Sequence, residues 1–464
     1  MFALNSNEDI PLYKQLYNQI RERVLSGQLC ADFKLPSVRD LADELSVSRN
    51  TVDGAYQELY AEGYIYSKPR SGYFVSVLDH NAVLLPVSPK SRKSEYRVEP
   101  STDYLYNFHP ARLDRASFPA VLWRKCFIEI LCESSRDLCG YSEPQGELDF
   151  RRLIQSYLER SRGVICSPEQ IVICAGLQNS LDIVAQVLKS KHSTIAVENP
   201  GFFLPRSVFS NHSYKIVPTP VGPGGIDLEH LKAGNSTIAY VTPSHQLPLG
   251  CVMQVANRLM LIEWAEANGN FIIEDDYDSE LRYHGKPIPS LQGLRPNGNI
   301  IYLGTFSKIL SPALRISYLV LPYSLLATYR RLFGDYCSQV SLLEQRTLAK
   351  FMELGHWDRY VRKTRTLYNK KHDTLLRAIE CHFGNRAIVV GQGAGLHVVL
   401  NLPYTQLNEA EIIKKAQQQR IYLNPFRKNF ASGEPESTNL MLGFGGMTVE
   451  EIEQGVALLS QICF

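Results

Sequence analysis

The sequence lacks the features that mark a membrane, secreted or disulfide-stabilised protein. It has no run of 18 or more apolar residues, and its start, MFALNSNEDI, lacks the basic-then-apolar pattern of a signal peptide. Its ten cysteines are scattered singly, without a C-x-x-C pair, so neither a disulfide framework nor a zinc site is indicated. We therefore expect a cytoplasmic protein without a structural metal and without a membrane partner.

Neither sign of charge is in clear excess. The chain has 49 Lys and Arg against 47 Asp and Glu, a net charge of +2, so bulk electrostatics predict neither a nucleic-acid binder nor a membrane-surface protein. Its 464 residues are enough for at least two domains with cores of their own. Function must therefore be inferred from local patterns.

The most informative stretch runs from residue 271 to residue 320. A predicted strand at 271–273 ends in three carboxylates, at 274–276, which are followed by Tyr277. A second predicted strand at 300–303 runs into the segment GTFSK. Polar groups just past the carboxyl ends of strands lie where open α/β sheets bind their ligands.

These groups match the needs of a pyridine aldehyde phosphate. Lys308 can supply the amine for a Schiff base, and Asp275 or Asp276 can face the ring nitrogen and keep it protonated. The side chains spaced to converge on the phosphate are Thr305, Ser307 and Arg315. The alternative interpretation is that Lys308 is an ordinary surface lysine beside a solvated acidic turn. The order of the groups along the chain favours a cofactor site: a strand followed by Asp-x-Tyr, a second strand followed by Ser-Lys, and then Arg.

Residues 1–78 have the pattern of a helix-turn-helix with a β-hairpin wing. Apolar residues at steps of four from Leu12 to Val24 predict a first helix. In LPSVRDLADELSVSRNTVDGAYQELYAEG, Ser37 and Ser48 can each cap a short helix, with a tight turn between the two. In the segment YIYSKPRSGYFVSV, the residues then alternate in character on both sides of a basic turn, which predicts a β-hairpin with a basic tip.

Charge and position give opposite indications for this region. Residues 1–78 contain eight Lys and Arg against ten Asp and Glu, which favours a plain helical bundle. The positions of its polar residues favour contacts with the phosphates and base edges of operator DNA. The predicted DNA-binding residues lie on the second short helix, its predecessor and the wing tip: Arg39, Ser48, Arg49, Asn50, Thr51, Lys68, Arg70 and Gly72.

Residues 79–104 predict an exposed linker. The stretch is rich in Pro, Ser and alternating charge, without helical or strand periodicity. Its basic cluster, Lys90, Arg92 and Lys93, either adds phosphate contacts or only solvates the loop.

From residue 105 to 464, strand-like runs alternate with helical ones. The six strand-like runs lie at 171–175, 194–198, 237–242, 271–275, 299–304 and 316–321. Such alternation predicts a mostly parallel sheet with helices on both faces. The turn at 175–179, which includes Leu177 and Gln178, joins a predicted strand to a helix and offers free backbone N–H groups to a phosphate.

The segments TPSHQLPLG, IIEDDYDSE and GTFSKILSPALRISY resemble the MocR/GabR regulators. LPSVRDLADELSVSRNTV also resembles the signature of the GntR family. The resemblance runs from about residue 10 to the C-terminus and weakens in the linker. It implies a GntR-type winged helix-turn-helix joined to a fold-type I aminotransferase-like domain, whose mostly parallel sheet is accompanied by a smaller α+β subdomain. It also implies pyridoxal 5'-phosphate as the cofactor.

The resemblance assigns further roles. It implies that the turn at 175–179 holds the cofactor phosphate, that Phe202 stacks over the pyridine ring, and that Tyr277 contacts the ring oxygen. Tyr141 matches a tyrosine that reaches the partner subunit's phosphate in related dimers. We therefore expect a domain-swapped, head-to-tail homodimer that binds a double-stranded, palindromic operator.

Two departures from working aminotransferases bear on function. Leu247 stands where those enzymes have an Asn for the ring oxygen, and Met441 stands where they have an Arg for the substrate carboxylate. Arg427 could approach an effector from another direction. We therefore expect a transcriptional regulator, not an enzyme, controlled by pyridoxal phosphate, by an amino compound, or by both. The alternatives are a competent aminotransferase with an accessory DNA-binding domain, and a large domain that serves only as a dimerisation scaffold.

Overall fold

The structure is a computed structural model that describes residues 2–5, 10–78, 103–133, 138–283, 289–435 and 437–464. The chain divides into two compact units, Met1–Pro100 and Ser101–Phe464. The predicted linker, with Lys90, Arg92 and Lys93, lies outside the described residues except for its last two positions. Of these two, Asp103 accepts a hydrogen bond from Arg420 of the second unit at 3.0 Å.

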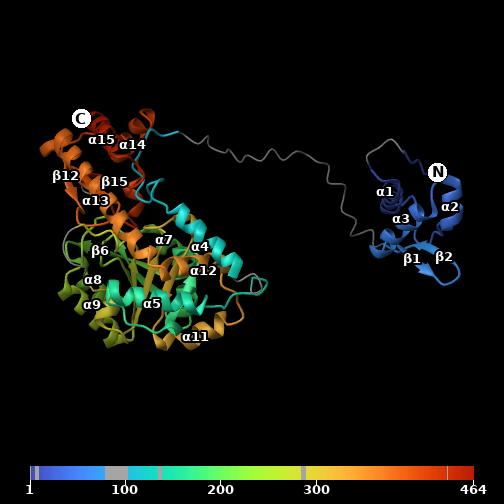
Figure 1. Cartoon of the computed structure of the whole chain (residues 1–464), viewed down its shortest axis with the longest axis horizontal. Coiled ribbons are helices and arrows are strands. Elements are labelled where there is room, and N and C mark those ends of the chain that lie inside the picture. The colour runs from blue at the N-terminus through green and yellow to red at the C-terminus, as the bar shows by residue number, and fades with distance from the viewer. Residues whose placement is uncertain (1, 6–9, 79–102, 134–137, 284–288, 436) are drawn as a thin grey trace. The chain divides into compact units, whose positions relative to one another are not determined.

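The first unit is a winged helix (Figure 1). Its elements are α1 (Leu12–Leu25), α2 (Val38–Leu45), α3 (Arg49–Ala61), β1 (Ile65–Lys68) and β2 (Gly72–Val75). The side chain of Ser37 accepts the N–H of Asp40 and caps α2, and that of Ser48 accepts the N–H of Thr51 and caps α3. Both predicted helix starts are therefore confirmed.

The core of this unit follows the predicted apolar stripe of α1. Leu16, Ile20 and Val24 are fully buried and share one cluster with Val52 and Leu59 of α3. This packing holds α3 against α1 and leaves the opposite side of α3 exposed.

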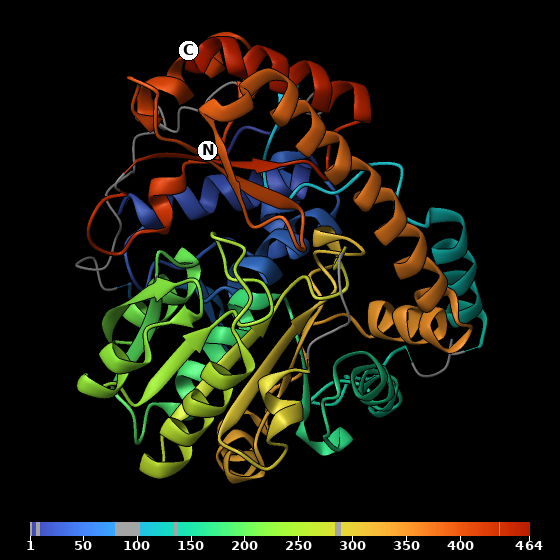
Figure 2. The same cartoon turned by 90° about the vertical axis from the view of Figure 1, so that its left-hand side faces the viewer.

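The second unit is built on a mostly parallel sheet of eight strands in the order β4-β11-β10-β9-β8-β5-β6-β7 (Figure 2). The strands are β4 (Ile171–Cys174), β5 (Thr194–Asn199), β6 (Lys215–Gly222), β7 (Gly225–Ile226), β8 (Ile238–Val241), β9 (Phe271–Asp276), β10 (Ile300–Thr305) and β11 (Ser317–Val320). The five strands from β10 to β6 run parallel, whereas β11 is antiparallel to both of its neighbours and β7 is antiparallel to β6. The predicted sheet is confirmed.

Sequence patterns predict six of these strands but miss β6 and β7. The sequence of β6, KIVPTPVG, contains two prolines and is only partly buried, so it lacks the continuous apolar run of the central strands. Proline is tolerated in sheets near an edge, where β6 lies.

Helices cover both faces of this sheet. One core cluster joins the strands to α6 (Leu177–Leu188), α7 (Phe203–Asn211) and α11 (Tyr323–Phe333), and another joins them to α8 (Leu228–Ala233), α9 (Val255–Asn268) and α10 (Leu291–Leu294). Successive residues of β9 alternate between these clusters, with Ile273 in the first and Ile272 in the second.

The rest of the second unit contains a smaller α+β part. Its elements are β3 (Tyr106–Asn107), α4 (Ala120–Glu133), α5 (Leu148–Arg162), α12 (Leu342–Glu353), α13 (His356–Phe383), β12 (Ile388–Val390), β13 (His397–Leu402), α14 (Glu409–Gln418), β14 (Ile421–Tyr422), β15 (Thr438–Gly443) and α15 (Val449–Cys463). Strands β12, β13 and β15 form an antiparallel sheet, and α13 packs beside α15 (Figure 2). None of the helices in the described segments is both long and apolar enough to cross a bilayer.

Candidate functional site

A cavity of about 350 Å³ lies at the carboxyl ends of β9 and β10. The structure places nine of the ten residues predicted for the cofactor in its lining: Leu177, Gln178, Phe202, Asp275, Tyr277, Thr305, Ser307, Lys308 and Arg315. The tenth, Tyr141, does not line the cavity of its own chain and is 94% exposed. Five separate stretches of chain between residues 177 and 315 therefore meet at one place.

Lys308 follows β10 and points its amine into this cavity. The backbone N–H of Ser307 donates to the Oγ1 of Thr305 at 3.1 Å, which fixes the turn that carries the lysine. The amine lies 5.8 Å from the centre of the Tyr277 ring. Burial lowers the pKa of Lys308, although the nearby carboxylates of Asp278 and Asp275 oppose this shift. A lysine that loses its proton more easily is a better nucleophile toward an aldehyde.

Asp275 and Asp276 have different environments because neighbouring residues of a strand point to opposite faces. Asp275 lines the cavity and accepts a short hydrogen bond from the hydroxyl of Tyr240. Burial raises the pKa of Asp275 to about 7, even though the Tyr240 hydrogen bond favours its charged form. Of the two carboxylates left open by the sequence, Asp275 is the one that lines the cavity.

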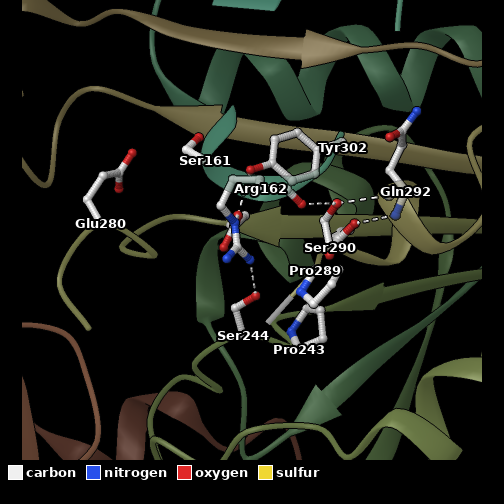
Figure 3. Close-up of polar contacts among 12 residues, drawn as sticks. Ser161, Arg162, Pro243, Ser244, Glu280, Pro289, Ser290, Gln292 and Tyr302 are labelled. Carbon is white, nitrogen blue, oxygen red and sulfur yellow. Dashed lines mark hydrogen bonds and ion pairs between the residues drawn. The ribbon is translucent and has the colours of Figure 1, made fainter. Parts of the chain in front are cut away.

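Asp276 is used inside the protein. Its Oδ2 accepts the Nε of Arg162 at 2.5 Å and the hydroxyl of Tyr302 at 2.5 Å. Arg162 also donates to Ser244 at 2.7 Å, on the loop that follows β8 (Figure 3). Burial, the largest influence, lowers the pKa of Arg162, but the charges of Asp276, Tyr302 and Glu274 and the hydrogen bond to Asp276 together outweigh burial and raise this pKa. This buried ion pair ties α5 to β9 and β8.

The other end of the cavity is suited to a phosphate. Leu177 and Gln178 begin α6, and the first backbone N–H groups of a helix have no partner within the helix. Gly176 precedes them with φ +83°, and a Cβ at this position would lie 2.4 Å from the guanidinium of Arg315. The absence of a side chain at Gly176 therefore lets Arg315 approach the start of α6.

Tyr277 has neighbours that the sequence analysis missed. Its hydroxyl donates to the carbonyl of His245 at 2.9 Å and lies 3.1 Å from the Nδ1 of that ring. The same Nδ1 lies 2.8 Å from Asp278. Leu247 lines the cavity, where an amide was expected in a working aminotransferase. His245 and Asp278 lie 33 residues apart, so no local spacing links them.

The two residues singled out for an effector lie away from the cavity lining. Met441 is buried in an apolar cluster with Val399 and Phe426. Arg427 is half-exposed, contacts the carbonyl of Gly433 and pairs with Glu434 at 3.2 Å. A role for Arg427 in effector binding stays a prediction, and it would require this ion pair to open.

The predicted DNA-binding residues lie on the surface of the first unit. Apart from the partly buried Thr51, they are exposed on α2, on the first turn of α3 and on the hairpin. Lys68 and Gly72 face each other across the β1–β2 pair, and Arg70 in the turn between them has φ 62°. The Nζ of Lys68 lies 4.6 Å from the centre of the Phe74 ring. A recognition helix and a basic wing tip are thus present together in one small unit.

The fold and the cavity together define a DNA-binding protein with an aminotransferase-like domain. Residues 12–75 match the family model "Bacterial regulatory proteins, gntR family", and residues 114–459 match "Aminotransferase class I and II". The chain therefore belongs to the MocR-type transcriptional regulators of the GntR family.

Named relatives agree with this assignment. The chain is 39% identical over 456 residues to the uncharacterized HTH-type transcriptional regulator YdeL of Bacillus subtilis (strain 168), covering 98% of this chain and 97% of YdeL. It is 33% identical over 468 residues to the probable rhizopine catabolism regulatory protein MocR of Rhizobium meliloti, covering 98% and 94%. Among solved structures it is similar to the α-aminoadipate aminotransferase LysN of Thermus thermophilus, with a TM-score of 0.70 and 24% identity over 78% of this chain and 92% of LysN. That similarity shows the fold.

We expect Arg49→Ala to weaken operator binding about ten- to a hundredfold, because the exposed arginine at the start of α3 is placed to contact a base or phosphate. Gel shifts on the operator measure the change. Thermal unfolding serves as the control and should be unchanged, since the side chain is exposed. Unchanged operator affinity would remove Arg49 from the recognition surface.

We expect Gly176→Ala to lower the affinity of the apo-protein for pyridoxal phosphate about tenfold or more, because the added Cβ displaces Arg315 from the start of α6. Gly269→Ala is the matched control, since Gly269 also has a left-handed backbone (φ +64°) but has no atom within 4 Å of the added Cβ. Titration of both apo-proteins with the cofactor measures the effect. Equal losses in the two variants would mean that backbone strain, not Arg315, is responsible.

Proposed function

We propose that the cavity at Lys308 binds pyridoxal 5'-phosphate and that occupancy of this cavity controls operator binding by the winged helix. The observation that supports the proposal is the convergence in one cavity of an amine, a buried carboxylate and the first residues of a helix, whose free N–H groups suit a phosphate. When bound, this cofactor supplies an aldehyde on an electron-withdrawing pyridinium ring.

Each end of the cofactor has candidate partners in the lining. Lys308 would hold the aldehyde carbon, and Asp275 would accept a hydrogen bond from the ring nitrogen. Phe202 would pack on the ring, and the hydroxyl of Tyr277 would contact the ring oxygen. The groups available to the phosphate are Leu177, Gln178, Thr305, Ser307 and Arg315.

The charges of the lining favour the cofactor itself as the signal. In the described part of the lining, Lys308 and Arg315 are the two basic side chains, and the cofactor would use both. An amino acid effector would need a further cation for its carboxylate, and the buried Met441 cannot provide one. Loss of that charge-assisted contact is worth about 1.5–3 kcal/mol. An amino compound remains the alternative effector if Arg427 leaves Glu434.

Catalytic turnover is a second candidate function. It is supported by the aminotransferase fold and by the presence in the cavity of Lys308, Asp275 and Tyr277, the residue types expected in a working aminotransferase site. It is disfavoured by Leu247 and Met441, which replace polar groups expected in such enzymes. Sustained steady-state turnover of amino acids with keto acids would establish the enzyme; its absence would support a regulatory role for the domain.

We expect pyridoxal phosphate, added to apo-protein, to change operator affinity, because a regulator must bind DNA differently in two states. Fluorescence anisotropy on the operator measures this, and Lys308→Ala should lose the response. The titration is then repeated on cofactor-loaded protein with amino acids and taurine-like amines. If operator affinity does not change with the cofactor but changes with an amine, the cofactor is not the signal and the amino-compound alternative is supported.

We also propose a head-to-tail homodimer in which Tyr141 reaches the partner's cavity. Tyr141 is 94% exposed and outside its own cavity, and α4 exposes the apolar side chains of Val121 and Ile128 (60% and 52%). Apolar side chains exposed along a helix are typical of an interaction surface. We expect light scattering to give twice the 52.5 kDa mass of one chain. A monomer at micromolar concentration would contradict this arrangement.

A further inference from the structure

A second cavity, of about 370 Å³, shares no lining residue with the first. It lies between the end of α5, the first half of α13 and the loop that follows β9. Four arginines and two serines line it: Arg160, Arg162, Arg362, Arg365, Ser161 and Ser279. Some of their donors have partners within the protein: the Nε of Arg162 donates to Asp276, the Nε of Arg365 to the carbonyl of Glu280 at 2.8 Å, and the hydroxyl of Ser161 to the carbonyl of Tyr157 at 2.7 Å. Apart from Arg162, which pairs with Asp276, none of these groups has a role in the cofactor cavity or in DNA recognition by the winged helix as described above.

Acidic groups offset only part of this positive charge. Asp358 lines the cavity, and so does Glu280, whose carboxylate accepts the hydroxyl of Tyr157 at 2.7 Å. Burial raises the pKa of Glu280 to about 7, so it is partly protonated near neutral pH. Within the described segments, no carboxylate forms an ion pair with Arg160 or Arg362. The cavity therefore has an excess of positive charge.

The shape and the donors favour a compact phosphate ester over a DNA backbone. A volume of 370 Å³ lies in the range of cavities that enclose small organic ligands. Arg160 comes from α5, whereas Arg362 and Arg365 come from α13, so basic side chains reach the cavity from two helices. Guanidinium groups bind phosphate oxygens in pairs, and the hydroxyl of Ser279 can donate to an oxygen that remains.

Arg162 connects this cavity to the first one. It lines the second cavity, and its Nε donates to Asp276, whose neighbour in β9 is Asp275 in the cofactor cavity. Figure 3 shows Glu280 and Ser161 on the opposite side of Arg162 from Gln292. An anion bound near Arg162 would compete with the carboxylate of Asp276 for the guanidinium group of Arg162.

We propose that the second cavity binds a small organic phosphate between α5 and α13, and that this binding is coupled to the cofactor cavity through the Arg162–Asp276 ion pair. The binding site does not depend on the proposed cofactor. Only its coupling does, so the two parts are tested separately.

The binding test uses the full-length protein loaded with pyridoxal phosphate and titrated by calorimetry with glycerol 3-phosphate and, separately, with inorganic phosphate. We expect saturable binding of glycerol 3-phosphate that weakens about tenfold or more in Arg362→Ala and in Arg365→Ala. Arg359→Ala is the matched control, because it removes the same charge from the same helix outside the cavity. Binding of both probes with equal affinity would show that the cavity takes the phosphate group alone and would overturn an organic ligand.

Two results would overturn the site itself. One is the absence of glycerol 3-phosphate binding to the wild-type protein. The other is an equal loss of affinity in Arg362→Ala and Arg359→Ala, which would indicate a diffuse basic face. Duplex DNA without the operator is tested in the same way. If this DNA binds to the protein, and Arg362→Ala and Arg359→Ala weaken its binding alike, the surface contacts DNA and the proposal is wrong.

The coupling test compares the affinity for glycerol 3-phosphate of the apo-protein and of the cofactor-loaded protein. Because coupling between two binding sites is reciprocal, we expect the two dissociation constants to differ by about fivefold or more. Equal constants would overturn the coupling. If the cofactor fails to load but glycerol 3-phosphate still binds to the apo-protein, the proposed function is wrong and this second site is not.

Discussion

Three consecutive buried carboxylates at the end of β9 are the constraint on which the site depends. A charge taken out of water costs free energy unless it is paired or hydrogen-bonded, so each carboxylate needs its own partner. Glu274 accepts the first N–H groups of α10, Asp275 accepts the hydroxyl of Tyr240, and Asp276 pairs with Arg162. These contacts hold β9 to α10, to β8 and to α5. They hold the carboxyl edge of the sheet in place, and the cofactor cavity opens at that edge.

Much of this site could be predicted from the sequence because its groups follow strands in a fixed order along the chain. The strand ends, the turn before α6 and the amine after β10 are local patterns, and the sheet then brings them together. The choice between Asp275 and Asp276 could not be predicted, because it depends on which face of β9 each one occupies. Arg162 lies 114 residues from Asp276, and the contact of His245 with Asp278 is also long-range. Contacts of this kind are fixed by tertiary packing and leave no periodic signal.

Of the two departures from a working aminotransferase, Met441 concerns the substrate, whereas Leu247 removes one contact to the ring oxygen of the cofactor. The other groups suited to the cofactor are retained. Lys308 and Arg315 are the two basic side chains of the described lining, and the proposed cofactor would use both, one for its aldehyde and one for its phosphate. Met441 packs into an apolar cluster, and Arg427 is engaged by Glu434. A site that keeps its cofactor groups but lacks a cation for a substrate carboxylate suits a sensor better than a catalyst. The winged helix supplies the output that a sensor needs.

The central claim is that pyridoxal phosphate is attached to Lys308, and peptide mapping tests it most directly. The purified protein is loaded with the cofactor, reduced with borohydride, digested and analysed by mass spectrometry. Lys308→Ala, treated in parallel, is the control. The account predicts the added mass of a reduced phosphopyridoxyl group on the peptide that contains Lys308, and its absence in the variant. Attachment at another lysine, such as Lys428, or no attachment at all in the wild-type protein, would contradict it.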